Sequence, residues 1–184
     1  MSAAIDVRGR RLQIVIGDIT AEGVDAIANA ANSALQGGGG VDGAIHAAAG
    51  PELLAELRSR YPSGTPTGSA VATAAHLLPA RWVLHAVGPV WLGGGSGEEE
   101  QLARAYRSCL QLADKLGARS LAFPAISLGI YGYPMRDGAR VALRTVAGHL
   151  AGPQTTLELV RFVLRDATYA AFAEALREME GHAD

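Results

Sequence analysis

Residues 29–46 read NAANSALQGGGGVDGAIH. The four glycines at positions 37–40 let the backbone adopt conformations that other residues avoid, and they let a ligand approach the main chain closely. A helical pattern of apolar residues follows at once, so amide groups from the glycine run and from the start of the helix can form a cradle for an anion. Because the helical pattern follows directly, few residues are available to form a flexible linker, and we interpret the run as a binding loop.

Polar side chains lie on both sides of this loop. Asp42 lies near the start of the expected helix, where the positive end of the helix dipole favours an ionised carboxylate. This carboxylate can orient or polarise a water, or it can simply cap the helix. His46 lies four residues further on and hence on the same helix face, as expected of a structural histidine paired with the backbone or with Asp42. Of Asn29 and Asn32, one can recognise a hydroxyl-rich ligand while the other braces the turn.

Short apolar runs alternate with helical patterns in the rest of the chain. The apolar runs predict strands at residues 12–16, 25–29, 69–75, 82–87, 120–123 and 157–164, and the helical spacing predicts helices at residues 102–116, 139–150 and 169–176. The alternation predicts a largely parallel or mixed sheet covered on both faces. Ligands bind such sheets at the carboxyl ends of the strands, which points to the loops at residues 17–20, 29–43 and 124–134. We interpret the glycine-rich stretch at residues 93–100 as a flexible surface loop instead, with acids suited to a helix N-terminus.

Length and composition exclude several classes of protein. The 184 residues suffice for one core, so we expect a single domain over residues 1–184. The net charge is −2 and no basic stripe for duplex nucleic acid is present. Cys109 is the only cysteine, and the five histidines (His46, His76, His85, His149 and His182) show no close ligand spacing, so we expect no metal and no cofactor. The sequence shows neither a signal peptide nor a membrane span, and we expect a cytoplasmic monomer.

One pattern in the glycine run suggests a different function. Gly38, Gly40 and Gly43 match the letters of the dinucleotide-binding fingerprint of oxidoreductases. However, these glycines do not directly follow a strand, and Tyr61, Pro62, Ser63 and Gly64 occupy the place of the acid expected about 20 residues further on. The nucleotide-dependent oxidoreductase is therefore the less favoured interpretation.

Several blocks, in this order and spacing, resemble macrodomains of the MacroD type. They are residues 17–20 (GDIT), 29–33 (NAANS), 37–50 (GGGGVDGAIHAAAG), 67–68 (TG), 78–80 (LPA), 85–89 (HAVGP) and 123–134 (FPAISLGIYGYP). The resemblance covers roughly residues 5–176. It implies a three-layer α/β/α fold, in which helices flank a mixed central sheet, and a binding site for ADP-ribose.

The resemblance also implies a role for each site residue. Adenine is assigned to Asp18, Ile19 and, at the end of the last strand, Asp166. The distal ribose and its phosphate are assigned to Asn32, Gly38, Gly39, Gly40 and Val41, and His46 is assigned as a further ligand-binding residue. The diphosphate is assigned to the loop residues Ser127, Gly129, Ile130, Tyr131 and Gly132, with Tyr131 flanking the distal ribose. Asn32 and Asp42 are the implied catalytic residues, and Asp42 either activates the attacking water or only orients it while the substrate's own phosphate helps.

The activity implied by the resemblance is hydrolysis of esters on the distal ribose. The expected reactions remove mono-ADP-ribose from Asp or Glu side chains of proteins and deacetylate O-acetyl-ADP-ribose. The expected partners are these ligands and proteins, with nucleic acid bound only where it is itself ADP-ribosylated. The alternative is a non-catalytic reader of ADP-ribose, which the presence of both Asn32 and Asp42 disfavours. The chain departs from the family pattern at Ala47, His76 and Leu128, and Leu128 bears on substrate preference because it lies in the phosphate loop.

Overall fold

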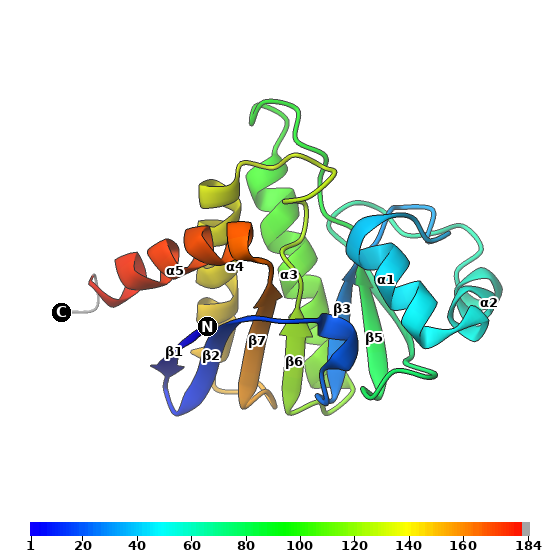
Figure 1. The fold of residues 1–184 in the computed structure, drawn as a ribbon, viewed down its shortest axis with the longest axis horizontal. Helices are drawn as coiled ribbons and strands as arrows, with labels where there is room; N and C mark the ends of the chain where they lie inside the picture. The colour runs from blue at the N-terminus through cyan, green and yellow to red at the C-terminus, as the bar shows by residue number, and fades with distance from the viewer. Residues whose placement is uncertain (182–184) are drawn as a thin grey trace.

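A computed structural model describes residues 1–181, which form a twisted sheet with helices on both faces (Figure 1). Over this range the sheet has seven strands in the order β1-β2-β7-β6-β3-β5-β4. Neighbouring central strands are parallel, whereas β1 and β4 run antiparallel to β2 and β5 at the two edges. The strands are β1 Ser2–Val7, β2 Arg10–Ile16, β3 Ala26–Ala30, β4 Ala70–Ala74, β5 Trp82–Ala86, β6 Ser120–Phe123 and β7 Leu159–Leu164.

The helices form two layers, one on each face of the sheet. They are α1 Gly40–Ala49, α2 Pro51–Arg60, α3 Glu98–Lys115, α4 Met135–Leu150 and α5 Asp166–Glu180, with a short 3-10 helix, η1, at Ile19–Ala21. Helices α3, α4 and α5 pack around an aromatic cluster of Tyr106, Phe123, Phe162 and Phe172. Helices α1 and α2 bury Ile45, Leu53 and Leu57 against the other face. The expected three-layer α/β/α architecture is therefore confirmed.

The six predicted strands are present, with ends shifted by at most two residues, whereas β1, α2 and the short η1 were not predicted. Strand β1 lies at the edge and has no buried residue, so its sequence carries no apolar run. Helix α2 starts at Pro51, directly after Gly50, whose φ of 85° turns the chain away from α1. Its short span buries only Leu53 and Leu57. No helix within residues 1–181 has the length and apolar character needed to cross a membrane. His182 lies outside the described residues.

The loop at residues 93–100 lies at the surface, as predicted, and its three acids form the first turn of α3, but Glu98 is buried and not solvated. The Glu98 side chain is only 1% exposed and accepts hydrogen bonds from the backbone N–H groups of Leu92, Gly94 and Ser96, at 3.2, 2.7 and 2.6 Å. Burial by itself raises the pKa of a carboxyl group, but these hydrogen bonds to the ionised form outweigh it and hold the pKa of Glu98 below its usual value. The acid therefore ties the loop to the first turn of α3.

Replacing Glu98 with Gln should destabilise the fold at neutral pH, because the amide offers one acceptor oxygen and no charge to the three N–H groups. The folded-state pKa of Glu98 is lowered, so its contribution to stability is present above the unfolded-state pKa and is lost as the pH falls through the folded-state pKa. Urea unfolding at pH 7 and at about pH 3 measures both effects. The exposed neighbour Glu99, changed to Gln, is the matched control, and equal midpoints for the two variants at pH 7 would contradict the assignment.

Candidate functional site

The carboxyl ends of the parallel strands bring the predicted loops to one edge of the sheet (Figure 1). Residues 17–25 follow β2, residues 31–39 follow β3, residues 87–97 follow β5 and residues 124–134 follow β6. Asp166, the first residue of α5, follows β7. This is the arrangement in which open α/β sheets bind ligands.

Asp42 is buried at the third position of α1, with 5% of its surface exposed. Its Oδ1 accepts a hydrogen bond of 2.7 Å from Asn29 Nδ2 and lies 3.3 Å from His46 Nε2. Its Oδ2 faces the glycine run, since a Cβ added to Gly38 would lie 3.2 Å from this oxygen. One carboxylate oxygen is therefore held by protein groups, and the other is turned toward the loop that was predicted to bind a ligand.

The two asparagines that the sequence left undecided have different surroundings. Asn29 is fully buried, and its Nδ2 contacts His85 Nδ1 at 3.2 Å in addition to Asp42. Asn32 donates from Nδ2 to the carbonyl of Gly37 at 2.9 Å. Its Oδ1 is buried and has no hydrogen-bond partner among residues 1–181. Asn29 thus braces Asp42, while Asn32 keeps a free acceptor beside the glycine run.

The loop at residues 124–134 lies against the glycine run. Ile130 is 84% exposed, and its Cδ1 would be 3.7 Å from a Cβ added to Gly39. Ser127 has a φ of 67°, and its buried Oγ has no hydrogen-bond partner in the described part of the chain. The loop is also held by α3, because the buried hydroxyl of Tyr106 in this helix accepts a hydrogen bond from the Ile126 N–H at 3.0 Å.

A second contact orders the far end of the same loop. The carbonyl of Tyr131 accepts from the Trp91 N–H at 2.9 Å, and the Trp91 ring packs on Tyr133 with 4.7 Å between centroids. Gly88 supports this arrangement, because a Cβ at that position would lie only 2.2 Å from Ser127 Oγ. Residues 127–132 therefore have a defined shape, and the Ile130 side chain lies beside Gly39 of the glycine run.

The residues expected at the adenine end lie apart from Asp42. Asp18 is exposed, and its Oδ1 accepts from the Thr20 hydroxyl at 2.7 Å and from the Thr20 N–H at 2.9 Å; these bonds lower the pKa of Asp18. Ile19 is buried beneath it and Asp166 is exposed at the end of β7. Strand β2 is three places from β3 in the sheet, which puts the two ends of the site about 14 Å apart at roughly 4.8 Å per strand.

Two residues near Asp42 were not predicted to contribute. His85 on β5 is fully buried, and its Nε2 lies 2.9 Å from Thr73 Oγ1 on β4. Burial, and then the neighbouring His46, lower the pKa of His85 to about 3. The signal for His85 was a polar residue inside an apolar strand, whereas nothing in the sequence distinguishes Thr73 from other strand threonines. No three His, Cys, Asp or Glu side chains within residues 1–181 gather as ligands for a metal ion.

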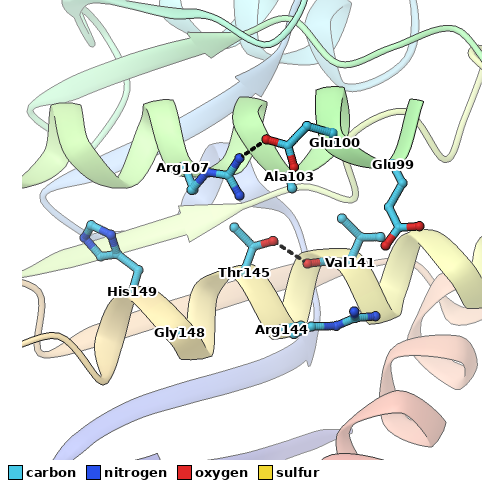
Figure 2. Close-up of a pocket in the computed structure, with 9 residues that line it drawn as sticks. All are labelled: Glu99, Glu100, Ala103, Arg107, Val141, Arg144, Thr145, Gly148 and His149. Atoms are coloured by element: carbon cyan, nitrogen blue, oxygen red, sulfur yellow. Dashed lines mark hydrogen bonds and ion pairs between the residues drawn. The ribbon is translucent and has the colours of Figure 1, made fainter. Parts of the chain in front are cut away.

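A groove of about 500 Å³ lies elsewhere, between α3 and α4 (Figure 2). Its polar groups partly satisfy one another, since Arg107 pairs with Glu100 and the Thr145 hydroxyl donates to the Val141 carbonyl at 2.7 Å. None of the predicted site residues lines it. The groove belongs to the helical layer opposite α1 and is not the candidate site.

Comparisons with known proteins agree on one family. Residues 28–142 match the family model described as Macro domain. A macro domain-containing protein of Streptomyces griseus is 58% identical over 90% of this chain and 94% of its own length. A Salmonella typhimurium protein named O-acetyl-ADP-ribose deacetylase is 50% identical over 93% of this chain and 96% of its own. The solved structure of an Oceanobacillus iheyensis macrodomain with ADP superimposes with a TM-score of 0.92 at 41% identity, covering 98% of this chain and 97% of that one.

The glycine at position 43 should be required by packing rather than by backbone conformation. A Cβ at Gly43 would lie 2.6 Å from the carbonyl oxygen of Gly38, so Gly43→Ala should destabilise the fold by about 1–3 kcal/mol. Gly148 is the matched control, because it is exposed in α4 with nothing within 4 Å of its added Cβ. Gly148→Ala should stabilise by roughly 0.5–1 kcal/mol. Urea unfolding measures both, and a Gly43→Ala protein as stable as wild type would show that the glycine run does not press on α1.

Proposed function

The chain belongs to the macro domain family, and on that premise we propose that it binds ADP-ribose and hydrolyses esters on its distal ribose. The proposed substrates are O-acetyl-ADP-ribose and proteins that carry mono-ADP-ribose on Asp or Glu. The observation that carries the proposal is the orientation of the Asp42 carboxylate: Asn29 holds Oδ1 by a hydrogen bond, and Oδ2 is turned toward Gly38. The name of the Salmonella relative supports the deacetylase reaction.

The shape of the site fits an elongated ligand with two unlike ends. Asp18, Ile19 and Asp166 take adenine at the ends of β2 and β7, which lie three and two places from β3, or about 14 and 10 Å by strand spacing. The N–H groups of residues 127 and 129–131 take the diphosphate between them, whereas the Gly132 N–H already donates to the Gly129 carbonyl at 3.0 Å. Backbone amides are the donors that suit this role, since the only lysine, Lys115, lies at the end of α3 outside these loops.

The distal ribose then lies over the glycine run, between α1 and the phosphate loop. Asn32 offers its unpartnered Oδ1 to a ribose hydroxyl, and Gly38, Gly39 and Gly40 allow the sugar to approach the backbone. Val41 and His46 form the wall on the α1 side, and Tyr131 flanks the sugar from the phosphate loop. This placement brings the ester close to Asp42 Oδ2.

Hydrolysis adds one water across the ester and needs no group beyond those of the site. The oxygen of the water bonds to the ester carbon, the bond to the leaving oxygen breaks, and a ribose hydroxyl and a carboxylic acid result. Asp42 Oδ2 accepts a hydrogen bond from the water and fixes its direction of attack. Backbone N–H groups of the two loops stabilise the charge that develops. In one version Asp42 also takes the proton of the water, and in the other a phosphate oxygen of the substrate does so.

Replacing Asp42 with Ala should nearly abolish turnover of both esters while the Kd for ADP-ribose changes by no more than about tenfold, or 1.4 kcal/mol. The binding contacts come mostly from other residues, whereas Asp42 is the side chain that directs the water in both versions. The measurements are release of the label from a protein mono-ADP-ribosylated on glutamate, release of acetate from O-acetyl-ADP-ribose, and calorimetric titration with ADP-ribose.

Asp137→Ala is the matched control, because Asp137 is likewise the third residue of a helix, α4, and lies outside the site. This control should keep full activity. Turnover by Asp42→Ala equal to that of wild type would rule out the role of Asp42. A wild-type protein that binds ADP-ribose and releases neither product would be a reader, the alternative function.

A further inference from the structure

A chain of buried polar side chains runs behind Asp42, away from the ligand. It consists of Asn29 on β3, His85 on β5 and Thr73 on β4, which are 0%, 0% and 1% exposed. Asn29 and His85 are direct neighbours in the register of the parallel pair β3 and β5. These strands lie next to one another in the sheet, so the chain connects Asp42 to the edge strand β4. None of the three side chains is exposed enough to contact a ligand from solvent except through Asp42.

The direction of each hydrogen bond in this chain follows from chemistry. An ionised carboxylate only accepts, so the amide nitrogen of Asn29 must face Asp42 Oδ1, at 2.7 Å. The second N–H of that nitrogen points to His85 Nδ1 at 3.2 Å, which therefore accepts. The proton of the neutral imidazole is then on Nε2 and is donated to Thr73 Oγ1 at 2.9 Å. The Oδ1 of Asn29 has no partner among the described residues, so only these two N–H bonds orient the amide.

The imidazole of His85 keeps one protonation state. Burial lowers its pKa to about 3, so it stays neutral at the pH of ordinary assays. The remaining freedom is the choice of tautomer. With the proton on Nδ1 instead, two N–H groups would face each other, and the Asn29 amide would turn its oxygen toward the carboxylate of Asp42. The Asn29 amide selects the Nε2–H tautomer, because its N–H needs His85 Nδ1 as an acceptor; the Thr73 hydroxyl then accepts the Nε2–H proton and holds the ring in place.

We propose that His85 and Thr73 are positioning residues for the hydrolysis: they fix the Asn29 amide, which holds Asp42 Oδ1 and thereby aims Oδ2 at the attacking water. The inference rests on the proposed function, because aiming the carboxylate matters only if a water is to be directed. Neither residue touches the substrate. Their effect is therefore on the rate of the chemical step and not on the affinity for ADP-ribose.

The test compares Thr73→Val with Thr73→Ser. Valine has the same shape without the hydroxyl, and serine keeps the hydroxyl without the methyl group. We expect Thr73→Val to lower kcat for O-acetyl-ADP-ribose about tenfold or more, because small misplacements of reacting groups have effects up to about 100-fold. KM and the Kd for ADP-ribose should stay within about twofold, or roughly 0.4 kcal/mol, because Thr73 does not touch the ligand. Thr73→Ser should retain most of the wild-type kcat.

A second readout does not depend on turnover. The ¹⁵N shifts of the His85 imidazole should report the Nε2–H tautomer in the wild type, and the Nε2 shift should change in Thr73→Val, where that N–H has lost its acceptor. Thermal unfolding confirms that each variant is folded, and His85→Phe provides a further variant in which the acceptor for Asn29 is removed while the ring is kept.

Each outcome decides the matter. An active wild type with unchanged kcat in Thr73→Val and His85→Phe overturns the positioning role and leaves the hydrolase intact. Equal losses in Thr73→Val and Thr73→Ser, or a loss of ADP-ribose binding that matches the loss of kcat, would show that position 73 is merely structural. A dominant Nδ1–H tautomer in the wild type contradicts the proposed chain. A wild type that binds ADP-ribose but cleaves neither ester overturns the proposed function, and the role of His85 falls with it.

Discussion

The hydrogen bond of 2.7 Å between Asn29 on β3 and Asp42 on α1 is the constraint on which the rest of the site depends. Both side chains are polar and buried, so each would destabilise the fold if it lost its partner. The two residues are only thirteen positions apart, and the chain between them must leave the sheet, form the glycine-rich loop and begin a helix. Gly37 and Gly40, with φ values of 80° and 60°, make this short connection possible.

Close approach explains other glycines around the same bond. Gly43 lets α1 lie against the carbonyl of Gly38, and Gly88, which follows β5, lets the loop at residues 124–134 approach closely with Ser127 buried. The two loops then meet where Ile130 approaches Gly39. The site therefore consists of packed backbone segments, and its amide groups are in place before a ligand arrives.

The sequence predicted the strands and the loops because apolar runs and glycines carry local signals. It failed where the signal is a specific contact of a polar side chain that no periodic pattern records. Glu98 looks like a solvated helix acid in the sequence, and only the structure shows its side chain folded back onto three N–H groups. The roles of Asn29 and Asn32 were undecided for the same reason. The chain through His85 and Thr73 depends on the strand order β3-β5-β4, which no local pattern states.

The buried chain also bears on the choice between a reader and a hydrolase. A reader of ADP-ribose needs the amide groups of the loops and the acceptor on Asn32, and none of these contacts requires Asp42 to point in one direction. Three polar side chains in the core are a cost that apolar residues of similar size would avoid. They serve a purpose if one carboxylate oxygen has to be held while the other is left for a water. His46, whose side chain is 15% exposed, is the second group that contacts Asp42 Oδ1. The fully buried His85 is neutral, so it can hold the Asn29 amide in position without adding charge beside the carboxylate.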